Sequence, residues 1–456
     1  MIKKLLIANR GEIALRIIRS AQELQIKTVA VYSTEDVDQL HVKFADESIC
    51  IGPAQSVESY LNVDNIISAA LSTNCDAVAP GYGFLSENAS FVKNLEEVGL
   101  KFVGPSSEII EMMGDKIAAR NLMIKNGVPV VPGSDGKVES EEEAFEIAER
   151  IGYPLLIKAS GGGGGKGMRR VFRSEDLKRE FNAAKSEAIA AFNNGDMYIE
   201  KLIVNPKHVE VQILADKFSN IVALGERDCS IQRKNQKMIE ESPCVRLNDD
   251  KRKELYETAI RAAKACNYEN AGTVEFVLDE ENKFYFIEMN TRIQVEHPVT
   301  EMVTNIDLIK EQLRITSGLR LSIKQEDVKV EGCAIECRIN AENPLNNFMP
   351  ESGEVEFFYG PGGVNTRFDS YLYSGARVSP YYDSMLGKII VKDKTRLGAI
   401  RKMRRALEEI IIDGVSTNQY LLYAILFDID FIRGNYSTSF IEEKLDELLN
   451  LMEAYR

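Results

Sequence analysis

The chain has 456 residues, 44% hydrophobic and 28% charged, a composition typical of a folded protein of about three domains at roughly 150 residues each. Only three histidines are present, which argues against sites built from several imidazoles, such as a three-histidine zinc centre. The 56 basic and 70 acidic residues give a net charge of −14, which argues against nucleic acid or a membrane surface as a partner.

The seven cysteines form no CxxC pair and are odd in number, so we expect free thiols in a reducing compartment rather than disulfides. The amino-terminal segment has no apolar run long enough for a signal peptide. No stretch approaches the ~18 apolar residues of a membrane span. We therefore expect a cytoplasmic protein.

The first region alternates strand and helix patterns. Residues 3–8 predict a buried strand, 11–24 an amphipathic helix and 28–32 the next strand. Strand patterns at 76–79 and 101–104 again alternate with helical stretches, which predicts a parallel sheet covered by helices. The first strand ends in ANRGEIA and lacks the GxGxxG pattern of a dinucleotide-binding domain.

A second region begins near residue 115, with predicted helices at 115–126 and 139–150. The strand LLIKAS, a run of glycines and the strand-like MRRVF follow, and hairpins and helices continue to about residue 330. The region from 333 is richer in short strands and turns and closes on an amphipathic helix at about 395–410. No internal repeat or proline-rich linker is present, so we expect the regions to pack as one body.

The most conspicuous segment runs from Lys158 to Gly167 and reads KASGGGGGKG. Successive glycines let backbone amides approach an anion closely. The segment departs from the P-loop pattern, because Ser160 stands at the first glycine position and Gly167 follows Lys166 where Ser or Thr is required. The segment formally fits GxGxxG, but a strand follows it rather than a helix. This favours a hairpin loop that folds over the phosphates of a ligand. The alternative is a flexible linker.

A second constellation lies between residues 272 and 301, where two strand patterns flank the turn DEENK. A hairpin there would bring Glu275 opposite or next to Glu288, and paired carboxylates repel unless a cation lies between them. With Asn290 they form an all-oxygen set that suits Mg²⁺ or Mn²⁺.

Polar residues then alternate without a break. Glu288, Asn290, Arg292, Gln294 and Glu296 would share one face of an extended chain. A solvated edge strand gives the same pattern, so both interpretations stay open. Arg292 beside Glu296 could hold a small oxyanion and deprotonate it.

Two further strands carry charged residues on one face. In KHVEVQIL the apolar residues form the core face and His208 lies on the other, where a lone histidine is more often a structural partner than a catalyst. In AIECRINAE, Glu336, Arg338 and Asn340 share a face. Arg338 could bind an anion or form an ordinary ion pair.

Eight segments together resemble the biotin carboxylase family of the ATP-grasp superfamily, in the family's order and from end to end. They are LLIANRGEIALRIIR, PGYGFLSEN, MGDK, IKASGGGGGKGM, GERDCSIQ, FIEMNTRIQVEHPVTEM, ECRINAE and PYYDSM. The resemblance implies an α/β and α+β protein with an ATP-grasp fold. Its parts would be a parallel α/β domain at 1–114, an ATP-grasp domain at 115–330 and a mixed carboxy-terminal domain at 331–456. A mobile glycine-loop lid would cover about 130–204.

The resemblance also implies a role for each matching residue. Those expected to bind ATP are Lys116, Lys158, Gly164, Gly165, Lys166, Glu200, Lys201, Ile203, His208 and Asn235, with Glu275 and Glu288 through the metal. Glu275, Glu288 and Asn290 would hold Mg²⁺ or Mn²⁺, as two ions. Bicarbonate would contact Lys237, Arg292, Gln294 and the Val295 amide. Glu296 would be the base that deprotonates bicarbonate, and Arg338 would stabilise the biotin enolate.

The implied enzyme is an ATP-dependent ligase that forms a carbon–nitrogen bond. Bicarbonate would attack the γ-phosphate to give carboxyphosphate, which releases CO₂ beside deprotonated biotin. Phosphoryl transfer between two anions needs a metal and Lys or Arg more than a nucleophilic side chain, in agreement with these residue types.

No AMKM-type lysine segment is present, so biotin is expected on a separate biotin carboxyl carrier protein. Carboxyltransferase subunits are the other implied partners, and the implied assembly is a homodimer. We favour acetyl-CoA carboxylase, and thus fatty acid synthesis, as the context. Alternatives are a carboxylase for pyruvate, propionyl-CoA or urea, and a nucleotide-binding regulatory protein without turnover.

Two positions depart from the family pattern. Asn235 stands where the family often has histidine, and Ala79 stands where HPGYG is common. Asparagine keeps a hydrogen bond but cannot titrate, which puts proton handling at this position in doubt.

Overall fold

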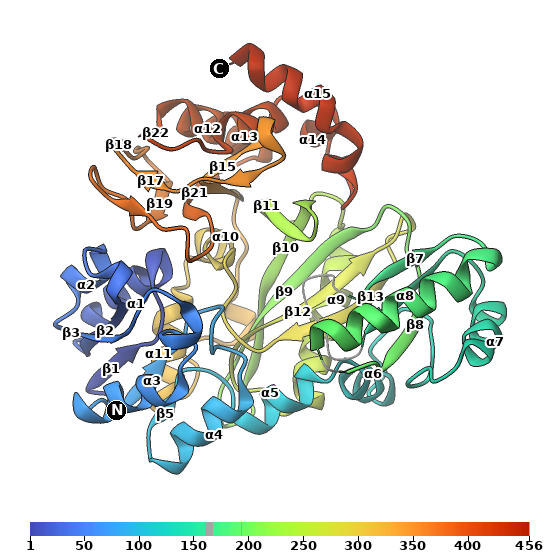
Figure 1. The fold of residues 1–456 in the computed structure, drawn as a ribbon, viewed down its shortest axis with the longest axis horizontal. Coiled ribbons are helices and arrows are strands. Elements are labelled where there is room, and N and C mark those ends of the chain that lie inside the picture. Colours follow the sequence, from blue (N-terminus) through green and yellow to red (C-terminus); the bar gives the residue numbers. More distant parts are fainter. Residues whose placement is uncertain (160–166, 193, 456) are drawn as a thin grey trace.

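A parallel sheet forms the amino-terminal part of the structure, a computed structural model that describes residues 1–159, 167–192 and 194–455 (Figure 1). Its strands are hydrogen-bonded in the order β3-β2-β1-β4-β5, with parallel register throughout. They are β1 (Lys4–Ile7), β2 (Lys27–Ser33), β3 (Glu47–Gly52), β4 (Ala77–Ala79) and β5 (Lys101–Phe102). The parallel sheet predicted from the alternating patterns is confirmed.

Side chains of this sheet enter two different cores, because strand residues alternate between faces. Leu5 and Ile7 pack with Leu214 and Leu313 of the next region, whereas Leu6 joins a second core. Helices around the sheet are α1 (Gly11–Glu23), α2 (Leu40–Phe44), α3 (Val63–Ser72), α4 (Ala89–Glu97) and α5 (Ser107–Gly114). One face of the sheet is thereby docked on the rest of the molecule.

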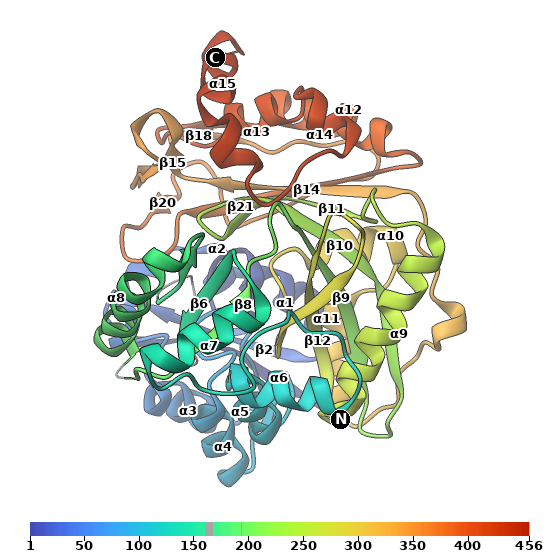
Figure 2. The ribbon, with the colours of Figure 1, turned by 90° about the vertical axis from the view of Figure 1, so that its right-hand side faces the viewer.

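A large antiparallel sheet occupies the centre of the molecule (Figure 2). Its eight strands lie in the order β13-β12-β9-β10-β11-β14-β21-β19. They are β9 (Lys207–Ala215), β10 (Ile221–Arg233), β11 (Gln236–Ser242), β12 (Asn270–Leu278), β13 (Phe284–Asn290), β14 (Cys333–Asn340), β19 (Thr366–Ser370) and β21 (Met385–Asp393). Ile239 of β11 lies opposite Cys337 of β14, so one continuous sheet joins the second and third regions.

Four helices accompany the central strands along the chain. They are α6 (Lys116–Lys125), α9 (Asp249–Ala265), α10 (His297–Thr304) and α11 (Leu308–Thr316). Helix α10 begins directly after the polar segment that the sequence marked at 288–296. It contacts β10, β14 and β21, which ties that segment to the sheet.

A smaller sheet of order β7-β6-β8 lies with two helices at the right of Figure 1. Its elements are α7 (Glu141–Ile151), β6 (Leu155–Ala159), β7 (Arg169–Val171), α8 (Ser174–Phe192) and β8 (Met197–Lys201). They enclose a core of their own that includes Ile157 and Phe181. Leu155 lies opposite Val171 in an antiparallel pair, so the glycine-rich segment connects two hairpin strands, as predicted.

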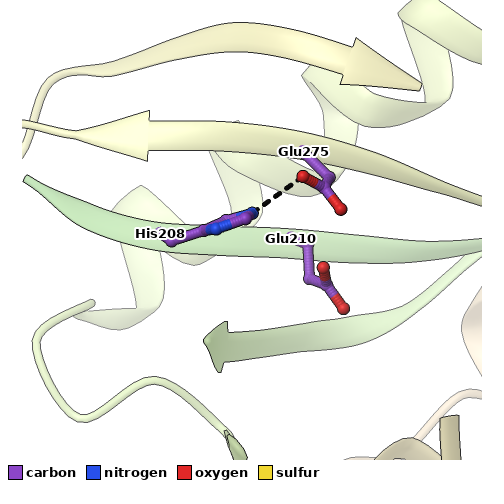
Figure 3. A group of neighbouring side chains, drawn as sticks. All are labelled: His208, Glu210 and Glu275. Atoms are coloured by element: carbon purple, nitrogen blue, oxygen red, sulfur yellow. Dashed lines mark hydrogen bonds and ion pairs between the residues drawn. The ribbon is translucent and has the colours of Figure 1, made fainter. Parts of the chain in front are cut away.

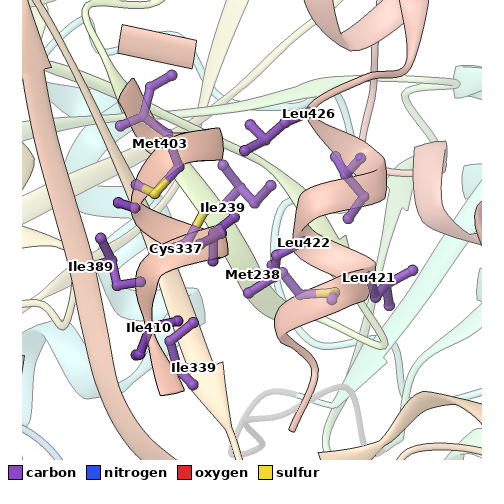
Figure 4. Close-up of a cluster of buried hydrophobic side chains, with 14 of the residues drawn as sticks. Met238, Ile239, Cys337, Ile339, Ile389, Met403, Ile410, Leu421, Leu422 and Leu426 are labelled. Carbon is purple, nitrogen blue, oxygen red and sulfur yellow. The ribbon is translucent and has the colours of Figure 1, made fainter. Parts of the chain in front are cut away.

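The carboxy-terminal region packs helices over the central sheet. Figure 4 shows Ile239, Cys337 and Ile389 from three neighbouring strands against Met403 and Leu422 from two helices. The helices are α12 (Arg396–Glu409), α13 (Gln419–Ile425), α14 (Ile429–Arg433) and α15 (Phe440–Tyr455). Short strands complete the region: β15 (Glu342–Asn343), β16 (Met349–Pro350), β17 (Gly353–Glu354), β18 (Phe357–Tyr359), β20 (Arg377–Val378) and β22 (Ile411–Asp413).

All seven cysteines lie in the described ranges and are free thiols, as expected. Among the described residues, no helix is both long enough and apolar enough to cross a membrane.

Candidate active site

A partly buried lysine lies at the centre of a cluster of carboxylates. Lys237, at the start of β11, places its Nζ 2.6 Å from Glu210 Oε2, 2.5 Å from Glu296 Oε1 and 3.3 Å from Glu275 Oε1. Burial alone would lower the pKa of Lys237, but the three carboxylates around it raise that pKa well above its ordinary value. The ammonium is therefore a fixed positive charge between three acidic side chains.

The hairpin of β12 and β13 brings two carboxylates together as predicted. Glu275 and Glu288 are directly paired across the strands. His208 Nε2 lies 2.9 Å from Glu275 Oε2, and Lys116 Nζ lies 3.1 Å from Glu288 Oε2 (Figure 3 shows the His208 contact). Burial alone would lower the pKa of His208, but the Glu275 charge raises that pKa above its ordinary value. Asn290 donates from Nδ2 to Glu275 Oε1 at 2.8 Å.

Several overlapping groups of the described residues could hold a cation here, among them Glu210, Cys229 and Glu296. His208, Glu210 and Glu275 have ligand atoms within 4.8 Å of one another (Figure 3). Lys237 contacts Glu210 and Glu275, and Lys116 contacts Glu288, so a divalent ion would lie near an ammonium beside any of these carboxylates. The cross-strand pair of Glu275 and Glu288 with Asn290 supplies only oxygen ligands, which fits Mg²⁺ or Mn²⁺.

Glu296 contacts two cations. Its Oε1 contacts Lys237, and its Oε2 accepts from Arg338 NH2 at 2.8 Å. Arg338 also donates from Nε to Glu240 Oε1 at 2.6 Å. Burial alone would raise the pKa of Glu296, but Lys237, Arg338 and Arg227 hold that pKa well below its ordinary value. The carboxylate is ionised and sits between two donors.

The extended chain predicted over 288–296 is wrong beyond Asn290. Residues 291–296 form bends and turns before α10 begins. The reason is a contact with the amino-terminal region: Glu87 accepts from the Thr291 amide at 3.1 Å and from Arg292 Nε at 2.9 Å. The loop still gathers the predicted side chains, because Arg292 NH1 donates to Gln294 Oε1 at 2.8 Å.

At the nucleotide end predicted from the sequence, two lysines approach acidic residues. Lys158 of β6 lies 2.6 Å from Glu200 of β8, and Lys116 contacts Glu288. Burial alone would lower the pKa of Lys158, but the Glu200 charge raises that pKa above its ordinary value. Lys201 points elsewhere, with Nζ 2.6 Å from the Tyr153 carbonyl oxygen.

The other predicted nucleotide residues are less tightly placed. Ile203 follows β8 and is half-buried. Asn235 is exposed in the two-residue turn between β10 and β11. Gly164, Gly165 and Lys166 lie outside the described residues.

Four residues of the site were not among the predicted ligands. Glu210 lies on β9 two residues after His208, and the alternation in KHVEVQ could have revealed it. Arg227, fully buried on β10, lies 2.5 Å from Glu210. Glu87 and Glu240 come from other elements, and no spacing rule connects them to residues 288–296. Their place depends on how the regions dock.

Comparison with known sequences decides the family. Residues 1–110 match the biotin carboxylase N-terminal domain, 115–324 the ATP-binding domain of the carbamoyl-phosphate synthase L chain, and 336–443 the biotin carboxylase C-terminal domain. The chain belongs to the biotin carboxylase family.

Individual relatives in this family cover nearly all of the chain. It is 55% identical to biotin carboxylase 1 of Bacillus subtilis over 97% of this chain and 98% of the relative. It is 55% identical to the biotin carboxylase of Haemophilus influenzae over 98% of this chain and 99% of the relative. The resemblance read from the motifs is confirmed.

Solved structures of the family share the fold. The Campylobacter jejuni biotin carboxylase, in a complex named βγ-ATP, superposes with a TM-score of 0.95 at 49% identity over 97% of this chain and 99% of that chain. The biotin carboxylase domain dimer of Hydrogenobacter thermophilus 2-oxoglutarate carboxylase, with MgADP, ADP and bicarbonate, superposes with a TM-score of 0.94. Its sequence is 48% identical over 98% of this chain and 99% of that chain. The biotin carboxylase subunit of a pyruvate carboxylase superposes with a TM-score of 0.86 at 50% identity over 98% of this chain and 99% of that chain. The expected ATP-grasp fold is confirmed.

Proposed function

We propose that this chain carboxylates biotin on a biotin carboxyl carrier protein, with bicarbonate and ATP as the other substrates. One observation carries the proposal: Glu275, Lys237, Glu296 and Arg338 form an unbroken chain of ion pairs. This series of ion pairs extends from the oxygen ligands suited to a metal to Arg338, the arginine that we assign to biotin. A base, its cations and a metal-binding edge are thus contiguous, as ATP-dependent activation of a small oxyanion requires.

Glu296 acts as the base in this proposal. Lys237 and Arg338 neutralise Glu296, which lowers its pKa. Bicarbonate, itself an anion, would compete for the same cations. As their hold on Glu296 weakens, its pKa rises toward the range of a useful base. Arg292 and Gln294, already bonded to each other, would hold the other bicarbonate oxygens.

The remaining roles follow the same assignment. Lys116, Lys158, Glu200 and His208 would contact ATP, as would Lys201, Ile203, Asn235 and the glycine-rich segment with Gly164, Gly165 and Lys166. Glu275, Glu288 and Asn290 would hold Mg²⁺ or Mn²⁺, and the ions would neutralise charge on the transferring phosphate. Arg338 would stabilise the biotin enolate, and the Val295 amide would bind bicarbonate.

We assign the domains to 1–114, 115–330 and 331–456, with the lid at about 130–204. The three sequence-family matches support this division. The separate core of β6, β7 and β8 supports a lid that moves as a unit.

The context we propose is the first half-reaction of acetyl-CoA carboxylase, as a homodimer in the cytoplasm that works with a carrier protein and carboxyltransferase subunits. The chain's similarity to full-length relatives that bear the name biotin carboxylase alone supports a separate subunit. A pyruvate carboxylase is the second candidate, because the solved biotin carboxylase subunit of one is 50% identical to this chain.

The experiment that tests the proposal measures ATP hydrolysis with and without bicarbonate and free biotin, and transfer of labelled bicarbonate to candidate carrier proteins. We expect hydrolysis to require bicarbonate and to rise with biotin. Glu296→Gln should lower kcat at least 100-fold, as expected for a general base, while nucleotide binding measured by calorimetry changes little. Glu281→Gln, in an exposed ion pair with Lys283, is the matched control and should behave as the parent protein. Nucleotide binding without any bicarbonate dependence would contradict the proposal and favour a regulatory protein.

A further inference from the structure

Two successive backbone carbonyls before α10 are each held by a buried side chain. The Gln294 carbonyl oxygen lies 2.8 Å from His297 Nδ1 and also accepts from the His297 amide at 3.3 Å. The Val295 carbonyl oxygen accepts from Lys388 Nζ. His297 and Lys388 both have fully buried side chains. Burial of such polar groups is costly, so their bonds to this loop fix its geometry firmly.

These two contacts determine where the next two amides point. In a trans peptide the carbonyl and the following N–H point in opposite directions. The Val295 amide therefore points away from His297, and the Glu296 amide points away from Lys388. Within the described residues, neither amide has a hydrogen-bond acceptor. Both donors are available to an anion beside the Glu296 carboxylate.

His297 can serve this purpose only through one nitrogen. The Gln294 carbonyl is an acceptor, so Nδ1 must carry the proton. Nε2 is buried and has no hydrogen-bond partner among the described residues. Burial, with the nearby charges of Lys388, Arg16 and Arg367, holds the pKa of His297 well below its ordinary value. A neutral imidazole with a permanent Nδ1 proton results.

Lys388 reaches the loop from the carboxy-terminal region. It lies on β21, directly opposite Arg338 of β14, so the two side chains share a face of the sheet. Its charge is paired with Glu12 of α1 at 3.1 Å, and Glu12 also accepts from the Tyr82 hydroxyl. The amino-terminal and carboxy-terminal regions thus both fix the Val295 carbonyl.

We propose that His297 and Lys388 are positioning residues for the anion subsite: each holds one carbonyl so that the Val295 and Glu296 amides face the bicarbonate. The inference rests on the proposed function, because it assumes bicarbonate as the anion. It assigns no proton transfer to either residue. Their loss should weaken bicarbonate binding and leave nucleotide binding nearly unchanged.

Two substitutions of His297 separate this role from simple packing. In His297→Asn the side-chain amide lies near the position of Nδ1 and can still donate to Gln294. In His297→Gln the side-chain amide lies near the position of Nε2 and no longer reaches Gln294. It faces the Glu301 carboxylate instead, which lies 4.0 Å from Nε2. We expect the KM for bicarbonate to rise about tenfold in His297→Gln and less than threefold in His297→Asn, with the KM for ATP within twofold of the parent in both. Equal bicarbonate defects in the two variants would overturn the role of His297.

Lys388→Met should raise the KM for bicarbonate about tenfold, and Lys388→Arg should restore part of the loss. Lys207→Met is the matched control, because Lys207 is equally buried and pairs with Asp228 at 2.8 Å away from this loop. It should lower the thermal midpoint without a selective rise in the bicarbonate KM. Tyr82→Phe removes one bond to Glu12 and is a milder variant should Lys388→Met not fold. It should raise the bicarbonate KM about twofold.

A direct readout keeps this test independent of turnover. Line broadening of ¹³C-bicarbonate in the presence of MgADP measures anion binding to each variant, and circular dichroism confirms its fold. The parent should broaden the line, and His297→Gln and Lys388→Met should broaden it less at equal concentration. Unchanged broadening in both variants would overturn the inference. If the parent binds bicarbonate but shows no bicarbonate-dependent ATP hydrolysis, the proposed function fails while the subsite stands.

Discussion

Acidic and basic side chains alternate through the site from Glu240 to Glu275. Arg338 lies between Glu240 and Glu296, and Lys237 lies between Glu296 and Glu275. Glu296, Lys237 and Arg338 each have partners on two sides, so removal of Glu296 takes away one ion pair from each neighbour and leaves another in place. The ion pairs of the fold and the proposed catalysis therefore involve the same side chains here.

Sequence patterns identified most of these residues but not their partners. Alternation in KHVEVQ and in the β12–β13 hairpin placed His208, Glu275 and Glu288 on defined strand faces, and the structure confirms it. The partner of Arg292 could not be predicted, because Glu87 lies about 200 residues earlier in the chain, on a loop of another region. Contacts of this kind are set by docking of whole regions.

A buried histidine away from the site gives a prediction for acid stability. His41 is fully buried, and burial lowers its pKa to about 4. The unfolded chain takes up a proton near pH 6.5, whereas the folded chain stays neutral to about pH 4. The stabilisation is present above pH 6.5 and is lost as the pH falls through this window, by about 3 kcal/mol.

Urea unfolding followed by circular dichroism between pH 4 and pH 7 checks this. In His41→Gln, which can still donate to the Val31 carbonyl, the fall in unfolding free energy with acid should be shallower by that amount. The same slope in both proteins would show that other groups control acid stability.

Among the elements, the β10–β11 hairpin explains one departure from the family pattern. Lys234 and Asn235 connect the paired residues Arg233 and Gln236, with φ of +49° and +63°. Two positive φ values in a two-residue loop define a type I′ turn, in which asparagine is favoured. The residue thus suits the turn whether or not it contacts a nucleotide.

Substitutions at Asn235 separate the turn from the nucleotide. Asn235→Gly should keep stability within a few tenths of a kcal/mol, whereas Asn235→Ala should cost about 1 kcal/mol because alanine resists positive φ. If the side chain also binds ATP, both variants raise the KM for ATP by a similar factor, measured by steady-state hydrolysis. A rise in Asn235→Ala alone would assign the effect to the turn.

Across the whole molecule, one carboxylate joins three regions. Glu301 of α10 accepts from Arg16 of α1 at 2.8 Å and from Arg367 of β19 at 2.6 Å. The periodicity of the chain predicted helices and strands in each region, and the family resemblance implied three domains. Neither predicted the contacts of Glu301, because no local pattern specifies contacts between regions.

Loss of the Glu301 charge should therefore destabilise the assembly of regions. Glu301→Gln should lower the free energy of unfolding by about 3 kcal/mol, since Arg16 and Arg367 each lose one of their two carboxylate partners. Urea unfolding measures the change, with Glu281→Gln as an exposed control that should show none. An effect no larger than the control would mean that Asp307 compensates Arg16 and that Asp369 compensates Arg367.

The continuous central sheet sets the spacing of the chemistry. Four steps between neighbouring strands separate β12, which carries Glu275, from β14, which carries Arg338. At roughly 4.8 Å per step, measured along the sheet, these steps set the spacing between the backbone that carries the proposed metal ligand and the backbone that carries the arginine proposed for biotin. An inserted or deleted strand would change that length in whole steps, and no adjustment of side chains could restore it.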